Sequence, residues 1–452
     1  MIIWTDAVVR EALGLSQVLG KVPPPFSEIS TDTRSMLPGA LFVALKGERF
    51  DGHHHLVAAQ AAGATAAVVR EGTAEVPGLI LYPVADTLEA YGRLARARRR
   101  SITGPVIAIG GANGKTSTKE MCAAALRTRY RVHATPANDN NLVGVPKTIL
   151  AAPADTEALV IEAGASVPGE LARARPIIEP TVSVTTNVVV SHLDGFGSLD
   201  GVLAEELDLL DGVPLAIVGT EPVSLAEGAR SRALRVITAG LARADRVPQS
   251  VSMDSTGRPT LAVDGQRITL PLLGQHQAGN AMLAWALATE LDLDMAQVAE
   301  ALRQLRIPGG RGEVIEAGGL TIVNDAYNAN PASFLAAIAT ARAMRGGRRL
   351  VFVAGTMREL GDEAARHHAA VAAALVGLEP DLLAATGEFV PVLQLYAGRL
   401  GDRLLVAPDA PAMGPLLKAR LHGDELVILK ASRGAALERI LPYLTGQDHS
   451  TH

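Results

Sequence analysis

The sequence has few aromatic residues, one cysteine and no long apolar run, and each shortage excludes a class of protein. Aromatic residues make up 3% of the 452 residues, so alanine, valine and leucine must fill the cores. The single cysteine, Cys122, rules out an internal disulfide and fits a reducing cytoplasm, and its alanine-rich helical surroundings predict a small buried side chain. No apolar run approaches the roughly 18 residues that a membrane span needs, and no signal peptide is evident, so we expect a cytoplasmic protein.

An excess of positive charge is also missing. The formal net charge is -5, which argues against nucleic acid as the main partner, because that partner needs a basic surface. Hydrophobic residues make up 48% and charged residues 20%, the proportions of a globular protein. The length predicts about three domains at roughly 150 residues each.

The first predicted domain covers residues 1–100 and ends in a cluster of arginines before the segment 101–105. This arginine run could bind phosphate, but a solvated helix end that leads into a linker is the better interpretation. The run consists of Arg93, Arg96, Arg98, Arg99 and Arg100.

The second predicted domain, residues 101–308, alternates short apolar runs with helical stretches. A continuous apolar run of four residues is typical of a buried parallel strand, and the alternation indicates a doubly wound α/β domain. The predicted strands are 106–109, 158–161, 181–185 and 215–218, with a helix from Lys115 to about Tyr130.

The third predicted domain, residues 309–452, begins after a break at Ile307-Pro308-Gly309-Gly310 and shows the same alternation. We therefore predict a second parallel α/β sheet. Its predicted strands are 320–323, 349–353, 382–385, 404–406 and 426–429.

A glycine-rich turn stands between the predicted strand at 106–109 and the helix that follows. Glycines allow backbone N–H groups to approach phosphate oxygens, and a helix N-terminus adds positive potential. Lys115 would reach the β- and γ-phosphates and the hydroxyl of Thr116 would bind magnesium. Ile109 stands where the full phosphate-loop pattern has a glycine. The turn runs Gly110-Gly111-Ala112-Asn113-Gly114-Lys115-Thr116-Ser117.

Two strand ends carry side chains that could hold a metal beside this turn. Glu162 follows the strand at 158–161, and His192 occupies a similar position, where α/β sheets bind ligands. A lone histidine is more often a packed or surface residue, so only the neighbouring motifs support the interpretation of His192 as a metal ligand. The triplet at 53–55 is no metal cluster, because consecutive side chains diverge. His449 and His452 belong to a polar tail.

The order of several short motifs along the chain resembles that of the Mur ligases. The first domain contributes Ser30-Thr31-Asp32-Thr33-Arg34 and Leu45-Lys46-Gly47-Glu48. The central domain contributes Gly114-Lys115-Thr116, Asn138-Asp139-Asn140-Asn141 and Gly274-Gln275-His276 with Asn280. The third domain contributes Arg311, Asn324-Asp325-Ala326-Tyr327-Asn328-Ala329-Asn330-Pro331, Glu359-Leu360-Gly361 and Lys430-Ala431-Ser432-Arg433. Each fragment is modest evidence, but their order over three domains makes coincidence very unlikely.

This resemblance implies a small UDP-binding α/β domain, a central phosphate-loop ATPase-like domain and a Rossmann-like third domain that binds the incoming amine. It is nearest to the members that use ATP and Mg²⁺ to join D-alanyl-D-alanine to UDP-N-acetylmuramoyl-tripeptide in peptidoglycan synthesis. A substrate carboxylate would attack the γ-phosphate to give an acyl phosphate, which the amine then attacks. We expect a monomer that binds no nucleic acid and has no membrane span.

The resemblance also implies which residues carry each role. The expected catalytic residues are Lys115, Glu162, His192 and Glu206, and Thr116, Glu162 and His192 would hold the metal. ATP would bind to Gly111, Asn113, Gly114, Lys115, Thr116, Ser117, His276, Asn280, Arg311 and Asp325, with Asp325 at the ribose and Arg311 towards the γ-phosphate. The other substrates would bind to Ser30, Asp32, Thr33, Arg34, Gly47, Asn140, Asn141, Tyr327, Asn328, Asn330, Ser432 and Arg433.

One departure from the family pattern bears on the chemistry. Mur ligases of this type usually carry a carbamylated lysine that binds a second magnesium ion. The corresponding position here is Glu206, and no lysine occurs between Lys147 and Lys418. Our hypothesis is that Glu206 supplies a carboxylate in place of the carbamate.

Two alternatives stay open at this point. The chain could be a divergent ligase that joins a different amine to a UDP-linked carboxylate. It could also be a catalytically weak homologue that acts as a scaffold in wall synthesis.

Overall fold

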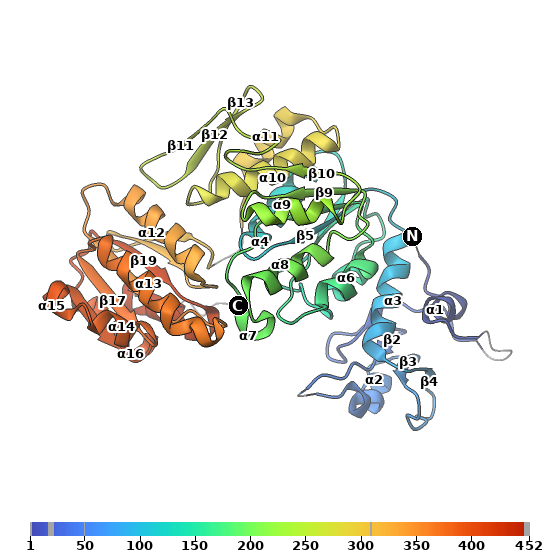
Figure 1. Cartoon of the computed structure of the whole chain (residues 1–452). Coiled ribbons are helices and arrows are strands. Elements are labelled where there is room, and N and C mark those ends of the chain that lie inside the picture. The colour runs from blue at the N-terminus through green and yellow to red at the C-terminus, as the bar shows by residue number, and fades with distance from the viewer. Residues whose placement is uncertain (1, 17–21, 49, 308–309, 447–452) are drawn as a thin grey trace. The chain divides into compact units, whose positions relative to one another are not determined.

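The computed structural model describes residues 2–16, 22–48, 50–307 and 310–446 (Figure 1), and the chain forms two compact units. The first unit contains residues 1–109, 129–165 and 169–183, and the second contains residues 110–128, 166–168 and 184–452. Pro308 and Gly309, where we predicted a domain break, and the tail with His449 and His452 lie outside the described residues.

The first unit begins with a small parallel sheet of order β1-β2-β3-β4. Apolar side chains cover both of its faces, because Leu41 and Val43 face one cluster and Phe42 faces the other. Tyr82 lies in the first cluster, where its hydroxyl donates a hydrogen bond to Asp6 (2.6 Å). The elements are α1 (Asp6–Leu13), β1 (Ile29–Ser30), β2 (Leu41–Val43), α2 (Leu56–Ala61), β3 (Ala66–Arg70), β4 (Ile80–Val84) and α3 (Thr87–Arg100).

The rest of the first unit contains three parallel strands in the order β5-β7-β6. Every residue of β5 and β7 is buried, which is why both strands are continuous apolar runs in the sequence. The elements are β5 (Val106–Gly110), β6 (Val132–Ala134), α5 (Gly144–Leu150), β7 (Ala158–Glu162) and α6 (Glu170–Ile178), and β8 (Val182–Thr185) leads into the second unit.

The arginine run forms the end of α3, and the expectation of a solvated end holds only in part, because Arg93 and Arg100 are exposed whereas Arg98 is buried. Arg98 is only 4% exposed, and its guanidinium donates to the carbonyls of Ala152 and Pro153. Arg100 donates to the carboxylate of Glu179 (2.7 Å), as Arg96 also does. The run therefore fixes α3 to neighbouring segments of its own unit.

The second unit contains the helix that follows the glycine turn and a helical layer packed on it. α4 (Lys115–Leu126) packs against α10 (His276–Glu290) and α11 (Met295–Arg303). Cys122 on α4 is fully buried, as predicted, and burial raises the pKa of its thiol. The other elements here are α7 (Leu193–Phe196), α8 (Leu199–Asp208), β9 (Leu215–Val218), α9 (Val223–Arg230) and β10 (Val236–Thr238).

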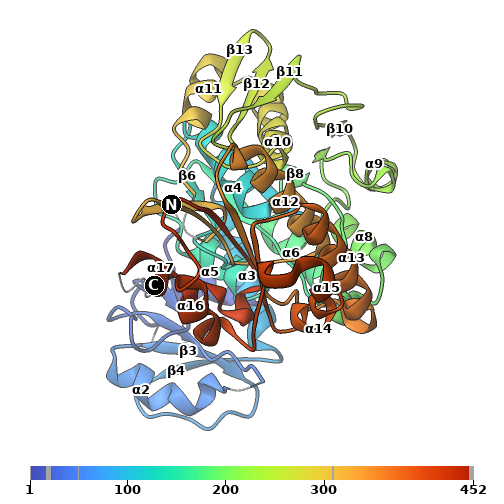
Figure 2. The same cartoon turned by 90° about the vertical axis from the view of Figure 1, so that its left-hand side faces the viewer.

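A small antiparallel sheet beside α10 and α11 was not predicted (Figure 2). It has the order β11-β12-β13, with β11 (Ser250–Met253), β12 (Pro259–Val263) and β13 (Gln266–Thr269). These strands mix polar and apolar residues over only four or five positions each, too short a stretch for alternation to stand out.

The last part of the second unit is a six-stranded sheet of order β14-β15-β19-β16-β17-β18, parallel except for β14. One face packs against α12, α13 and α14 and the other against α16 and α17 (Figure 1). The strands are β14 (Glu313–Ala317), β15 (Leu320–Asp325), β16 (Leu350–Ala354), β17 (Leu382–Thr386), β18 (Leu404–Ala407) and β19 (Leu426–Lys430). The helices are α12 (Pro331–Arg345), α13 (Ala364–Gly377), α14 (Phe389–Gln394), α15 (Ala397–Leu400), α16 (Ala410–Lys418) and α17 (Leu441–Thr445).

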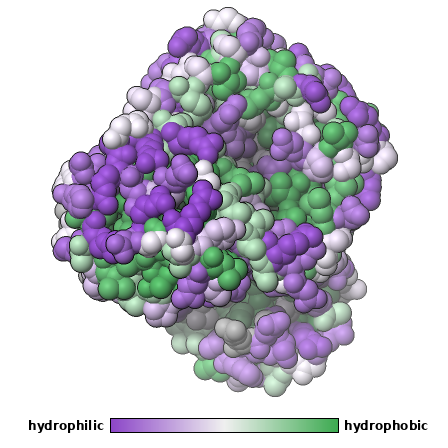
Figure 3. All heavy atoms as spheres, turned by 60° about the vertical axis from the view of Figure 1, so that its left-hand side comes forward, coloured by the Kyte–Doolittle hydropathy of each residue, from purple (hydrophilic) through white to green (hydrophobic). Residues whose placement is uncertain are grey.

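These strands confirm the predicted α/β class, because all nine strands predicted from apolar runs are present within one or two residues of their expected limits. The residue limits of the three domains stay a prediction. Across the described ranges of the chain, no helix is both long enough and apolar enough to cross a membrane. Hydrophilic and hydrophobic side chains are intermixed over the face seen in Figure 3.

Candidate active site

The glycine turn joins β5 to α4, with strand before and helix after as predicted. Gly111 (φ 113°) and Gly114 (φ 81°) have backbone angles that other residues rarely adopt. A Cβ atom on Gly114 would lie 2.7 Å from the Oδ1 atom of Asn280, and one on Gly111 would overlap the hydroxyl of Thr186. Both glycines are therefore required by the shape of the loop.

Three consecutive N–H groups at the start of the loop point to protein acceptors. The N–H of Gly111 donates to Glu206 Oε2 (2.6 Å), that of Ala112 to the carbonyl of Asn187 (2.8 Å), and that of Asn113 to Asn187 Oδ1 (3.1 Å). The next amides belong to Gly114 and the first turn of α4, where a helix presents its N–H groups along its axis. The loop can therefore bind phosphate from Gly114 onward.

The side chain of Lys115 lies over the loop, and its Nζ atom donates to the carbonyls of Gly111 (2.6 Å) and Ala112 (3.2 Å). These neutral acceptors satisfy an ammonium group only weakly compared with a phosphate. A flexible four-carbon chain can turn from them to an anion at the start of α4.

Glu206 lies on α8 and is buried under the loop. Burial raises the pKa of its carboxyl to about 7, although Lys115 and the N–H of Gly111 favour the charged form. A Cβ atom on Gly110 would lie 2.8 Å from Glu206 Oε2, so the carboxylate lies directly against the loop backbone. The prediction that Glu206 belongs to this site is consistent with that position.

Residues expected on the adenine and ribose side of ATP gather in the same unit as the loop. The amide of Asn280 lies against Gly114 and donates to Gln277 Oε1 (3.1 Å). Burial lowers the pKa of His276, while the carboxylate of Asp325 acts in the opposite direction. Asp325 forms an ion pair with Lys430 (2.8 Å).

The expected amine-binding residues cluster where β15 and β19 end. Two guanidinium groups lie over the ring of Tyr327, that of Arg311 at 3.9 Å and that of Arg433 at 5.3 Å from the ring centroid. Cations over a ring face are held by its quadrupole and keep their N–H groups available for anions. Beside them Lys430 Nζ donates to the carbonyl of Asn328 (2.7 Å), and Ser432 Oγ donates to that of Ala329 (3.2 Å).

His192 precedes α7 in a left-handed conformation (φ 50°) and faces Glu359, which is also left-handed (φ 63°). His192 Nδ1 lies 2.5 Å from Glu359 Oε2, a contact that is an ion pair when the imidazole is protonated, and the N–H of Leu193 donates to the carbonyl of Glu359 (2.8 Å). The hydrogen bond from His192 lowers the pKa of Glu359. Two non-glycine residues with left-handed backbone angles are thus held against each other.

In the first unit, Glu162 is the last residue of β7 and is buried. Its Oε1 atom accepts a hydrogen bond from Asn140 Nδ2 (2.9 Å), and its N–H donates to Thr135 Oγ1 (2.9 Å). Asn141 accepts from the N–H groups of Val143 and Gly144 at the start of α5. One expected substrate residue, Asn140, thus contacts the expected carboxylate of Glu162, and its neighbour Asn141 fixes the start of α5.

The expected UDP-binding residues of the first domain form local turns. Asp32 accepts hydrogen bonds from the N–H, Nε and Nη2 of Arg34 (3.0, 2.8 and 2.7 Å), which hold its pKa well below the usual range. The N–H of Asp32 also donates to Ser30 Oγ (3.2 Å), so Thr33 lies inside a closed turn. The N–H of Gly47 donates to the carbonyl of Phe50 (2.9 Å).

The residue types around the loop fit ATP and magnesium. Among the residues that the structure describes, no three His, Cys, Asp or Glu side chains form a ready-made metal cage. Magnesium bound to ATP needs few protein ligands, because phosphate and water supply the others. The hydroxyl of Thr116, in the first turn of α4, is a suitable oxygen donor.

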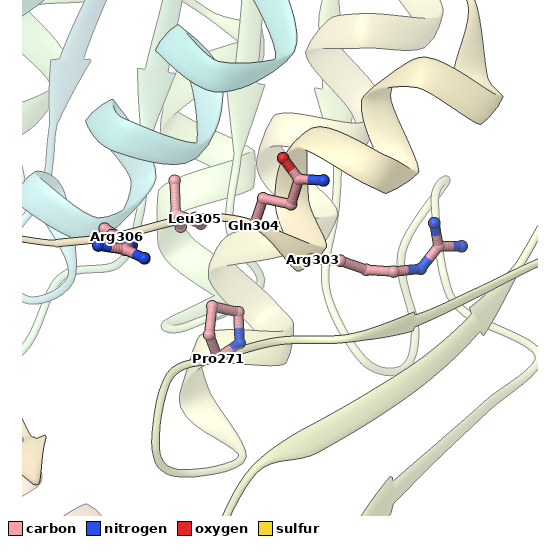
Figure 4. Close-up of a pocket in the computed structure, with 5 residues that line it drawn as sticks. All are labelled: Pro271, Arg303, Gln304, Leu305 and Arg306. Atoms are coloured by element: carbon pink, nitrogen blue, oxygen red, sulfur yellow. The ribbon is translucent and has the colours of Figure 1, made fainter.

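An open pocket of about 440 Å³ in the second unit is no competing site. Its side chains point in different directions (Figure 4). Arg303, the most extended of them, already donates to the carbonyl of Arg267 and to Glu300. The lining residues are Pro271, Arg303, Gln304, Leu305 and Arg306.

Comparison with known proteins identifies the family. Residues 109–288 match the Mur ligase middle domain, residues 310–433 the glutamate ligase domain of Mur ligases, and residues 25–99 the catalytic domain of the Mur ligase family. The chain is 34% identical over 424 residues to the UDP-N-acetylmuramoyl-tripeptide–D-alanyl-D-alanine ligase of Bacillus subtilis, covering 91% of this chain and 92% of the relative.

The chain belongs to the Mur ligase family. Another relative, the UDP-N-acetylmuramoyl-tripeptide–D-alanyl-D-alanine ligase of Escherichia coli, is 33% identical over 91% of this chain and 92% of its own length. A crystal structure of MurF from Acinetobacter baumannii has a TM-score of 0.88 at 27% identity and covers 99% of this chain and 100% of its own. The MurF ligase of Thermotoga maritima in complex with ADP has a TM-score of 0.82 at 25% identity, covering 92% and 96%.

Sequence reasoning about this Mur ligase missed two side chains that shape the loop, Thr186 and Asn187, and one contact, that of Glu359 with His192. Thr186 and Asn187 follow β8 directly, so the strand-end rule that found Glu162 could have found them. Glu359 was part of the matched motif, but its contact with His192 joins residues 167 positions apart and leaves no trace in spacing.

Proposed function

We propose that the chain is an ATP-dependent ligase that joins D-alanyl-D-alanine to UDP-N-acetylmuramoyl-tripeptide during peptidoglycan precursor synthesis. The observation that carries this proposal is the loop before α4. There Lys115 lies over the loop, and neighbouring atoms leave no room for a side chain at Gly111 or Gly114. The ATP-side and amine-side residues lie in the same compact unit. The relatives named above carry this activity in their names.

The proposed first step transfers a phosphoryl group to the substrate carboxylate. Lys115 leaves the loop carbonyls and neutralises the γ-phosphate. The backbone N–H groups of the first turn of α4, up to that of Ser117, bind the remaining phosphate oxygens. Asn280 and His276 contact the base, Asp325 the ribose, and Arg311 the γ-phosphate side. The products of this step are ADP and an acyl phosphate.

In the proposed second step the amine attacks the acyl carbon of the acyl phosphate, so that the amide bond forms and inorganic phosphate and a proton leave. Arg433 and Ser432, beside Tyr327, bind the carboxylate end of the dipeptide, because a guanidinium matches a carboxylate in shape and charge. Asn328 and Asn330 orient the chain next to them. Ser30, Asp32, Thr33, Arg34, Gly47, Asn140 and Asn141 bind the UDP-linked substrate.

When bound, magnesium would neutralise part of the phosphate charge. Thr116, Glu162 and His192 are the residues that we propose would hold it, and the hydroxyl of Thr116 and the carboxylate of Glu162 offer the oxygen atoms that Mg²⁺ prefers. For Glu206 we keep the hypothesis that its carboxylate serves in place of a carbamate. A ligation rate that does not depend on carbon dioxide supports this role, and undiminished turnover of a Glu206→Ala variant contradicts it.

A coupled assay of ADP release tests the proposal. We expect release with ATP, Mg²⁺, UDP-N-acetylmuramoyl-tripeptide and D-alanyl-D-alanine together, and little release when one is left out. Turnover only with another amine from a panel would indicate a divergent ligase, and ligand binding without hydrolysis would indicate a scaffold. We propose that the protein is cytoplasmic and monomeric. Size-exclusion chromatography with light scattering tests the monomeric state.

A further inference from the structure

The amide side chains of Asn113 and Asn330 bind each other, although 217 residues separate them in the chain. Asn113 Nδ2 donates to Asn330 Oδ1 (3.0 Å), and Asn330 Nδ2 donates to Asn113 Oδ1 (2.8 Å). Two reciprocal hydrogen bonds fix both the distance and the relative orientation of the two amide planes. We call this contact the amide pair.

One end of the amide pair is a fixed point of the phosphate loop. The carbonyl of Asn113 accepts from Thr186 Oγ1 (2.6 Å) and from Asn187 Nδ2 (3.0 Å), and its N–H donates to Asn187 Oδ1 (3.1 Å). The backbone of Asn113 is therefore held on both sides, directly before Gly114 and Lys115. Movement of its side chain would disturb the loop.

The other end is a fixed point of the helix that follows the amine-side turn. Asn330 is 5% exposed and caps α12, since its Oδ1 atom accepts from the N–H of Ser333 (2.9 Å) and Ser333 Oγ accepts from its N–H (2.9 Å). Asn330 Oδ1 thus serves the cap and the pair together. The turn before it carries Tyr327 and Asn328.

We propose that Asn330 is a positioning residue that acts through Asn113: the amide pair keeps the amine-side turn in register with the phosphate loop. This inference rests on the proposed function, because it gives the pair a task in a reaction that uses both parts. A neutral pair suits the task, because it orients without adding charge beside the phosphates. Asn330 then serves the reaction by fixing the loop, in addition to orienting the amine substrate.

Two matched variants separate the pair from the cap. Asn330→Ser keeps a good capping residue but is too short to reach Asn113, whereas Ser333→Ala weakens the cap and leaves the pair. We expect Asn330→Ser to lower kcat for ligation about ten-fold, as for loss of two neutral hydrogen bonds, with the KM for ATP changed less than about threefold. We expect Ser333→Ala to leave kcat unchanged.

The double variant provides the sharper kinetic test. If the two residues act only through each other, Asn113→Ala with Asn330→Ser is no slower than the more damaged single variant. If the loss of kcat in the double variant equals the product of the losses in the two single variants, the inference is overturned. Equal losses of kcat in Asn330→Ser and Ser333→Ala would overturn it as well.

A spectroscopic distance tests the pair without any enzymatic activity. Leu234 and Leu395 are 81% and 83% exposed and can be changed to cysteine for spin labels, because the native Cys122 is buried. We expect a narrow label distance in the parent and in Ser333→Ala, and a broader one in Asn330→Ser and Asn113→Ala. An unchanged distribution in both asparagine variants would overturn the inference. Lack of ATP binding by the parent protein would instead refute the proposed function, and the distances would still decide the role of the pair.

Discussion

Two stretches of this chain look suited to phosphate, the arginine run at 93–100 and the glycine turn at 110–117. In the arginine run, backbone carbonyls and Glu179 already bind the guanidinium groups. In the glycine turn, one lysine rests on neutral carbonyls at the start of a helix. The difference teaches that backbone shape, rather than the number of positive charges, marks the candidate phosphate site.

Removal of the one loop lysine should have the largest effect. We expect Lys115→Ala to lower ligation about 100- to 1,000-fold, because it removes a cation aimed at developing charge. The measurement is ADP release at saturating substrates. Arg96→Ala is the matched control from the arginine run, and a comparable loss in that variant would break the comparison.

A methyl group on the loop should come next. In Gly114→Ala the new Cβ meets the amide of Asn280 and the backbone stays left-handed, so we expect ATP affinity to fall about 10- to 100-fold. Gly212→Ala carries the same left-handed strain (φ 67°) with open space around its Cβ. Calorimetric titration of both variants with ATP separates the effect of left-handed strain, which both carry, from that of the clash with Asn280, which only Gly114→Ala carries. Equal ATP affinities of the two variants would show that the shape of the loop is unimportant.

Removal of a buried arginine should affect stability rather than nucleotide binding. Arg98→Ala leaves the carbonyls of Ala152 and Pro153 without their donor, and we expect a loss of about 2–4 kcal/mol in the free energy of unfolding. Urea unfolding measures this loss. If Arg98→Ala had normal stability but weakened ATP affinity, the arginine run, and not the glycine loop, would be the phosphate-binding element.

The smallest expected effect concerns Glu206, whose pKa is raised from 4.5 to about 7. The folded protein holds this proton more tightly than the unfolded chain does, so the contribution to stability is full below pH 4.5 and is lost as pH rises to about 7. We compare the free energy of unfolding of Glu206→Gln with that of the parent protein. We expect this difference to favour the variant more at pH 8 than at pH 4.5, by on the order of 2 kcal/mol. Parallel pH profiles of the two proteins would refute a buried proton at this position.

The elements that the sequence revealed are those with a strong local pattern. The strands at 106–109 and 426–429 are buried on both faces, so every side chain is apolar and the run stands out. The small sheet at 250–269 has no such pattern and was missed. Local pattern also located Lys115 and Glu162, because strand ends and glycine turns are visible in one stretch of chain.

The contacts that tune the candidate site could not be predicted in the same way. The amide pair and the pairing of His192 with Glu359 each join residues more than 150 positions apart, and an asparagine at a turn is too common to mark such a contact. The burial of Arg98 likewise depends on Ala152 and Pro153, whose carbonyls carry no sequence information. Such features depend on tertiary packing alone.

Calorimetric titration of the purified protein with ATP, with and without magnesium, tests the central assignment most directly. The account predicts saturable binding that requires the metal and disappears in Lys115→Ala. Absence of binding, or binding that Lys115→Ala leaves intact, would contradict it.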